Sequence, residues 1–143
     1  MIISREEYEK IKGNKSMFGK DDCPFCTTDL SNVTLRKGKY RAIIINIGSY
    51  TGTSEHIMAI PKAHKILMTD LDTNEIMELP LVFQAVKHIM NEKEYFSFTR
   101  ETVHNSGRSV EHLHIHYCPG QLQGEYLRHM LMKQGFPIVQ HLN

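Results

Sequence analysis

The stretch Ser109–Gly120 reads SVEHLHIHYCPG and places three of the chain's nine histidines, His112, His114 and His116, at alternate positions. Successive side chains of a strand point to opposite faces, so this spacing puts the imidazoles on one face and the apolar residues between them on the other. It predicts a strand from His112 to Cys118 with one buried face and one chemical face. A chance surface patch would not explain the apolar alternation. Clustered imidazoles are typical of nucleophiles, proton-transfer groups and metal ligands.

The length and charge of the chain limit its class. Its 143 residues suit one domain with its own core, so we expect a single domain over residues 1–143. Its 17 basic and 16 acidic residues are mixed along the sequence, and the formal charge of +1 offers no field for a nucleic-acid polymer. The longest apolar run, Ala42–Ile47, is far shorter than a membrane helix, and MIISREEYEK lacks the pattern of a signal peptide. We expect a cytosolic protein with neither nucleic-acid polymer nor membrane as partner.

Hydrophobic periodicity outlines the remaining elements. The expected strands are Val33–Leu35, Tyr40–Ile47, His56–Ile60, Phe96–Asn105 and His112–Cys118. The expected helices run from about Arg5 to Lys12, from Thr73 to about Glu94, and from Tyr126 to Gln134. In the long helix one apolar face is predicted, and Pro80 should kink or divide the helix; that face comprises Ile76, Leu79, Phe83, Val86 and Met90. Strands joined by short turns around one long helix predict an α+β fold with an antiparallel sheet of about five strands.

The motif Cys23-Pro24-Phe25-Cys26 lies in a polar loop, Gly13–Ser31. A CxxC motif fits a redox pair, a disulfide or half of a zinc site. The redox interpretation expects a thioredoxin-like βαβ unit, which the sequence lacks, and a reducing compartment makes a disulfide framework less favourable. A metal would order a loop that has little apolar content, but zinc needs two further ligands.

The histidine stretch resembles the signature of the histidine triad (HIT) superfamily, His-x-His-x-His followed by two apolar positions. The segment HIMAIPKAH, from His56 to His64, is similar to the family's His-x-x-x-x-Pro-x-x-His element, and Ser109 stands where many members carry a serine. From about Cys23 to Pro119 the resemblance covers roughly two thirds of the chain. It implies a HIT-like α+β fold with short terminal helices.

The resemblance also implies covalent chemistry at a nucleotide phosphate. His114 would attack the α-phosphorus of a nucleotide ester, anhydride or phosphoramidate, giving a nucleotidyl-histidine that water or another acceptor resolves. His116 would hold a non-bridging phosphate oxygen, and Ser109 would donate to the leaving group or the phosphoryl oxygens.

Four further residues are implied as contacts to substrate. Asn46 resembles a ribose-binding residue and Asn105 a phosphate-binding one, although either suits a turn equally well. His56 matches an active-site histidine of some members, the alternative being a half-buried strand histidine. Two loops depart from the family pattern: the one before His56 lacks its usual Pro, and the one before the triad is short, with Arg108 in place of a frequent Gln. A cation there would favour a more anionic substrate, such as a polyphosphate.

In HIT branches with an upstream CxxC, including galactose-1-phosphate uridylyltransferase, the two cysteines bind zinc with the histidine after the Pro element and the first triad histidine. The resemblance therefore implies one zinc per chain on Cys23, Cys26, His64 and His112. Four protein ligands leave no open position, so this zinc would be structural. Cys118 is interpreted as a small apolar residue at the end of its strand.

Two other functions remain open from the sequence. One is a nucleotide-binding or zinc-organised interaction module that has lost turnover. The other is a metal-dependent hydrolase that uses the histidine face as a catalytic metal site, for which two metals per chain would be expected. A homodimer is also implied by the resemblance.

Overall fold

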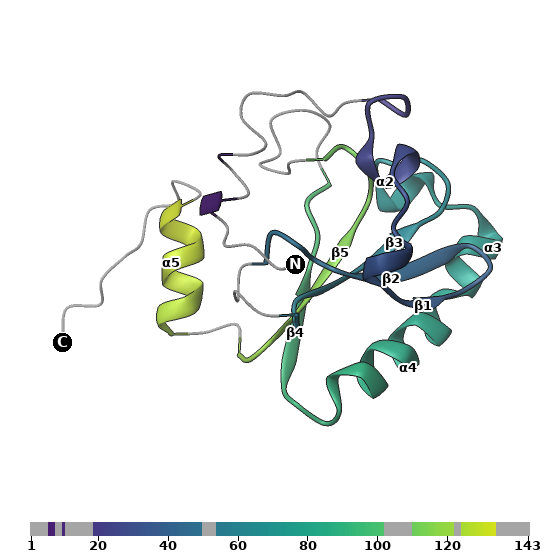
Figure 1. Cartoon of the computed structure of the whole chain (residues 1–143). Coiled ribbons are helices and arrows are strands. Elements are labelled where there is room, and N and C mark those ends of the chain that lie inside the picture. Colours follow the sequence, from purple (N-terminus) through teal and green to yellow (C-terminus); the bar gives the residue numbers. More distant parts are fainter. Residues whose placement is uncertain are drawn as a thin grey trace.

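The computed structural model describes residues 6–7, 10, 19–49, 54–101, 110–121 and 124–133. The strands are β1 (Thr34–Lys37), β2 (Arg41–Ile45), β3 (Ile57–Pro61), β4 (Tyr95–Phe98) and β5 (Ile115–Pro119). The helices are α2 (Pro24–Thr27), α3 (Thr73–Met77), α4 (Leu79–Met90) and α5 (Glu125–Lys133), with short 3-10 turns η1 (Ser31–Val33) and η2 (Met68–Asp70). The strands form one sheet in the order β1-β2-β3-β5-β4, with each neighbouring pair antiparallel (Figure 1). This confirms the predicted α+β fold with an antiparallel sheet of five strands.

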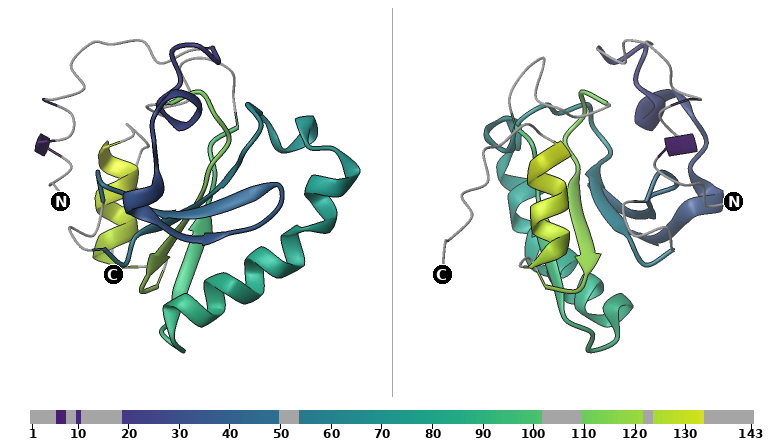
Figure 2. Two further views of the ribbon diagram at one scale, coloured as in Figure 1. Left: turned by 45° about the vertical axis from the view of Figure 1, so that its right-hand side comes forward. Right: turned by 90° about the vertical axis from the view of Figure 1, so that its left-hand side faces the viewer.

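Both faces of the sheet are covered, because its central strands are apolar on both sides. On one face, α4 packs against a core cluster of Ile43, Ile57, Ala59, Val82, Val86, Met90, Ile115 and Tyr117. On the other face, the segment around α2 and η1 packs on Ala42, Ile44, Met58 and Ile60 through Phe25, Leu30 and Val33. Figure 2 (right) shows α2 and α4 on opposite sides of the sheet.

The predicted division of the long helix at Pro80 is confirmed. The helix α3 begins with a capping box, in which Asp72 accepts the Glu75 N–H and Glu75 accepts the Asp72 N–H. The helix α4 then restarts at Leu79, with Pro80 in its first turn, where a missing N–H costs no helical hydrogen bond. Asn91, in the left-handed conformation with φ of 50°, caps its C-terminus.

The predicted apolar face of this helix was partly wrong. Val86 and Met90 are buried as expected, but Ile76 and Phe83 are 49% and 50% exposed, and Val82 is only 5% exposed. The buried stripe of α4 is centred on residues four apart, and Phe83 lies one residue, about 100° of helix rotation, away from Val82.

The histidine strand begins later than predicted. Its ladder with β3 runs only from Ile57 opposite Tyr117 to Ala59 opposite Ile115. Before Ile115 the chain bends at residues 110–112, and the Leu113 N–H bonds to the carbonyl of Lys65, 2.6 Å away, and not to a β3 residue. The segment after β3 therefore supplies the backbone partner of Leu113, the residue between the first two histidines.

The other predicted elements agree within a few residues. The strand expected over Phe96–Asn105 is β4, which ends at Phe98, and residues 102–105 lie outside the described part of the chain. Most of the helix expected from Arg5 to Lys12 also lies outside it. The closing helix is α5, to the side of the sheet away from α3 in Figure 1. None of the described helices is both long enough and apolar enough to cross a membrane.

Candidate active site and metal centre

The three histidines lie on the sheet face opposite α4. His116 stands across from Met58 of β3, so it shares the face of the α2-side core, while Ile115 and Tyr117 enter the α4-side core. The predicted alternation is therefore correct, but the chemical face is also covered, because His112, His114 and His116 are 0%, 9% and 4% exposed. An enclosed site strengthens electrostatic interactions and excludes competing water.

The middle histidine is held by its own chain. Nδ1 of His114 lies 2.6 Å from the carbonyl oxygen of His112. A carbonyl only accepts, so Nδ1 carries the proton and the lone pair of a neutral His114 ring is on Nε2. The Phe25 and His116 rings lie edge-on to the His114 ring, with centroids 5.6 and 4.7 Å away. This geometry fits a nucleophile whose tautomer and orientation are fixed before substrate binds.

The third histidine belongs to a polar row on the same face. Nδ1 of His116 lies 2.9 Å from Nε2 of His56, and one proton is shared between these nitrogens. The Asn46 amide nitrogen lies 3.3 Å from Nε2 of His56, and its Oδ1 accepts the Gly48 N–H. The Phe98 ring stacks on the His116 ring at 4.6 Å and 14°. Asn46, His56 and His116, which are separated in the sequence, are thus brought together.

The four residues implied as zinc ligands form one cluster. Their donor atoms, on Cys23, Cys26, His64 and His112, all lie within 4.8 Å of one another. Nδ1 of His112 is 3.3 Å from Sγ of Cys23 and 3.4 Å from Sγ of Cys26, and Nδ1 of His64 is 3.4 Å from Sγ of Cys26. Sulfur and nitrogen ligands on a tetrahedral zinc stand about 3.5 Å apart. The spacing of this donor set therefore fits zinc.

The hydrogen bonds of the cluster also fit a metal. Nε2 of His112 lies 2.8 Å from the carbonyl oxygen of Pro61, so Nε2 donates and Nδ1 turns its lone pair to the sulfurs. All three cysteines of the chain are free thiols, which excludes a disulfide in the CxxC motif of this structure. Burial raises the pKa of the Cys23 thiol to about 11, so a nearby cation is needed to make it a thiolate at neutral pH.

On the α4 side of the sheet, a buried carboxylate forms an ion pair with the segment that follows β3. Lys65, whose carbonyl accepts the Leu113 N–H, pairs through Nζ with Oε1 of Glu75 at 3.2 Å. Arg41 lies 1% exposed near Glu75, and burial lowers its pKa while the carboxylates of Glu75 and Glu78 oppose that shift. The ion pair ties α3 to the residue that follows a metal ligand.

The site residues predicted from the sequence have different outcomes in the structure. The structure brings together the four proposed metal ligands, and it places His114, His116, His56 and Asn46 on one face. Ser109, Asn105 and Arg108 lie outside the described residues, so their predicted roles stay predictions. Cys118 is fully buried, as expected for a small residue at the end of a strand.

The sequence did not predict that two aromatic side chains, Phe25 and Phe98, line the site. Phe25 was visible inside the CxxC motif, but nothing local showed that its ring meets His112 and His114. Phe98 faces His116 because these two residues are register partners in β4 and β5. Only the strand pairing gives that information.

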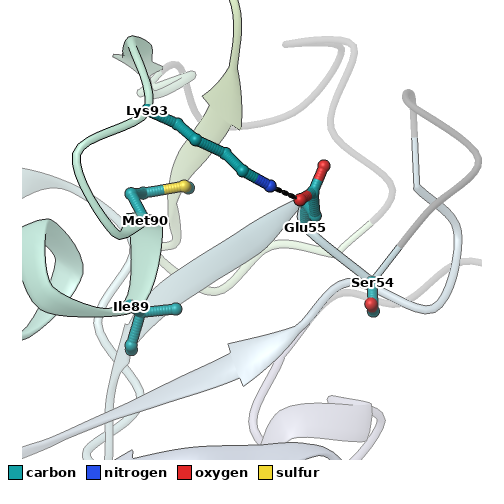
Figure 3. A pocket seen from close by; sticks show the side chains of 5 residues that line it. All are labelled: Ser54, Glu55, Ile89, Met90 and Lys93. Atoms are coloured by element: carbon teal, nitrogen blue, oxygen red, sulfur yellow. Dashed lines mark hydrogen bonds and ion pairs between the residues drawn. The ribbon is translucent and has the colours of Figure 1, made fainter.

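A cavity of about 200 Å³ lies elsewhere, between the start of β3 and the end of α4 (Figure 3). Ser54, Glu55, Ile89, Met90 and Lys93 line it, and Lys93 pairs with Glu55. Met90 belongs to the α4-side core, so this cavity is not on the histidine face. Apart from this partly exposed ion pair, the residues that line the cavity include no cluster of side chains suited to catalysis.

Comparison with known proteins agrees with this fold and site. The sequence profile described as "HIT domain" matches residues 31–122, and the chain belongs to the HIT domain family. Among curated proteins, no match was found.

Solved structures share the fold at low identity. A histidine triad protein from Clostridium difficile is similar with a TM-score of 0.57 and 18% identity over 76% of this chain and 99% of that one. A Zn-bound histidine triad family protein from Mycobacterium smegmatis gives 0.58 and 20% over 76% and 81%. Diadenosine triphosphate hydrolase from Plasmodium falciparum, in complex with cyclomarin A, gives 0.54 and 18% over 73% and 76%.

Proposed function

We propose that this protein is a nucleotide hydrolase or nucleotidyltransferase of the histidine triad type. The observation that carries the proposal is the fixed tautomer of His114, whose Nδ1–H is bound to the carbonyl of His112 while Nε2 keeps its lone pair. The site is buried and rich in nitrogen donors, as a phosphoryl-transfer site requires. Support for the substrate class comes from the similarity to a diadenosine triphosphate hydrolase.

In the proposed reaction, Nε2 of His114 forms a bond to the α-phosphorus of a nucleotide. The bond from phosphorus to the leaving group breaks, and its electron pair departs with that group. Water then cleaves the P–N bond and releases the nucleoside monophosphate, or another acceptor takes the nucleotidyl group, and either route restores the imidazole. Imidazole suits both steps because it attacks and leaves readily near neutral pH.

The surrounding residues have proposed roles in this reaction. His116 would donate to a non-bridging oxygen, with its ring oriented by His56 and Phe98. Asn46 braces His56 and would reach the ribose from the same position. Ser109, Asn105 and Arg108 keep the roles that the sequence implies, near the leaving group and the phosphates.

We further propose one zinc per chain on Cys23, Cys26, His64 and His112. A zinc with four protein ligands supplies no open coordination site and acts by fixing structure. The link to the nucleophile would come from His112, which turns Nδ1 to the metal and places its carbonyl against His114. The similarity to a Zn-bound family member supports this assignment.

A homodimer and a cytosolic location also remain proposals. Ile76, Met77, Leu81 and Phe83 leave exposed apolar surface around the α3–α4 junction, and exposed apolar clusters commonly mark protein contacts. A second copy of the chain is the partner that the family resemblance implies.

The direct test is intact-protein mass spectrometry after brief incubation with adenosine phosphoramidate or a dinucleoside polyphosphate, under an acid-free quench. The wild type should gain the mass of one nucleoside monophosphate, and His114→Ala should not. Absence of both adduct and product in the wild type across several nucleotides would favour the alternative of a silent nucleotide-binding or interaction module. Two metals per chain, with activity abolished by chelation while the fold persists, would favour the metal-dependent hydrolase.

A further inference from the structure

The β4 side of the histidine face carries a second chemical feature. Phe98 is the register partner of His116, so the two side chains share a face, as their stacking confirms. The ladder between β4 and β5 ends at this pair, and Arg100 follows two residues after Phe98. The guanidinium carbon of Arg100 lies 5.8 Å from the centre of the Phe98 ring. Because the His116 and His114 ring centroids are 4.7 Å apart, Arg100, Phe98, His116 and His114 form a row in which each side chain lies next to the following one.

This row adds a permanent positive charge beside otherwise neutral groups. Arg100 is partly buried at the end of β4, where a cation acts more strongly than in bulk water. The carboxylate of the following residue, Glu101, accepts the N–H of Met68 at the start of η2. The two consecutive charges are therefore directed at different partners.

We propose that Arg100 is a specificity-determining residue that selects substrates whose leaving group is anionic. This inference rests on the proposed attack by His114. A guanidinium stays protonated at working pH and binds phosphate oxygens through paired N–H donors, but it does not give up a proton. It can therefore neutralise charge on a leaving nucleoside diphosphate and has nothing equivalent to offer a departing amine.

The two classes of substrate differ at this point. With diadenosine triphosphate, the His114–phosphorus bond forms, the P–O bond to ADP breaks, and ADP departs with the electron pair as an oxyanion. With adenosine phosphoramidate, the P–N bond breaks and the nitrogen must gain a proton from solvent or another acid to leave as ammonia. Both reactions transfer the same AMP group to His114, so the ratio of their kcat/KM values isolates the leaving group.

The experiment compares this ratio, diadenosine triphosphate over adenosine phosphoramidate, in the zinc-loaded wild type and Arg100→Gln. The ratio should fall by about 10-fold to 100-fold, the usual effect of one lost charge-assisted contact. Arg100→Lys keeps the charge without the planar fork and should give an intermediate ratio. Arg36→Gln removes the same charge from β1, at the opposite edge of the sheet, and should leave the ratio at the wild-type value.

The outcomes separate this inference from the proposed function. If the wild type turns over both substrates and the Arg100→Gln ratio stays within about twofold of it, the specificity role of Arg100 is refuted while the function stands. If the wild type forms no adduct and no AMP from either substrate, the proposed function itself fails. Should Arg100→Gln not fold, Arg100→Met removes the charge and keeps a long side chain, and an unchanged ratio in that variant also refutes the proposal.

Discussion

At the scale of single residues, two backbone carbonyls determine which ring nitrogen carries the proton in His112 and in His114. The Pro61 carbonyl accepts from Nε2 of His112 and leaves Nδ1 for the metal cluster. The His112 carbonyl accepts from Nδ1 of His114 and leaves the lone pair on Nε2, the atom proposed to attack phosphorus. Residues of one type, two positions apart on one face, thus present different nitrogens. The proposed zinc site and the proposed nucleophile are linked through the single residue His112.

Tyr117, on the opposite face, gives a prediction on pH. Burial raises the pKa of its hydroxyl from 10.0 to about 12, so the folded state holds the proton more tightly than the unfolded state. The corresponding stability is fully present below pH 10 and is lost as the pH rises from about 10 to about 12, by on the order of 2 kcal/mol. Urea unfolding at pH 8.5 and pH 11 should show about half of that loss, because pH 11 lies midway between the two pKa values, and Tyr117→Phe, which removes this titration, should lose less. Equal losses in the two proteins would contradict the assignment.

At the scale of elements, α4 shows how far periodicity reaches. The sequence predicts a helix interrupted at Pro80, because proline is tolerated only where no N–H is needed. Its apolar pattern leaves two adjacent choices for the buried stripe, since Val82 and Phe83 are both apolar. The docking angle of α4 on the sheet resolves that choice in favour of Val82. Similarly, the alternation around the histidines predicts the faces but not that β5 begins at Ile115.

The stripe can be tested by matched substitutions in α4. Val86 is fully buried in the α4-side core, so Val86→Ala should lower the free energy of unfolding by about 2 kcal/mol. Phe83→Ala deletes more atoms from a half-exposed position and should cost less. Chemical denaturation of both variants checks the order, and a larger loss for Phe83→Ala would show that the predicted apolar face, with Phe83 buried, was correct.

At the scale of the whole molecule, the metal cluster joins three distant segments of the chain. Its ligands come from the polar loop at Cys23 and Cys26, the turn after β3, and the approach to β5. A structural zinc contributes directly to folding free energy when its ligands meet only in the native state. The loop around α2 has few apolar residues of its own, so we expect it to depend most on the proposed zinc.

Two cysteine variants test this dependence. Cys23→Ser should lower zinc stoichiometry well below one per chain and lower Tm with it, because one ligand of the closed site is lost. Cys118→Ala changes a buried cysteine that is outside the cluster and should keep full zinc. Metal analysis and thermal unfolding of both proteins give the readout. Unaltered zinc content in Cys23→Ser would sink the assignment.

The sequence by itself determined the family, the antiparallel α+β class and the common face of the histidines. These follow from local periodicity and short spacings, which survive without knowledge of any distant contact. Through the family resemblance, the sequence also predicted the four proposed metal ligands, which the structure brings together. The tertiary structure alone decided which backbone carbonyls lie against His112 and His114, which aromatic rings line the site, and that Arg100 lies over the Phe98 ring. Those features depend on strand register and on carbonyls from other segments, so no local pattern contains them.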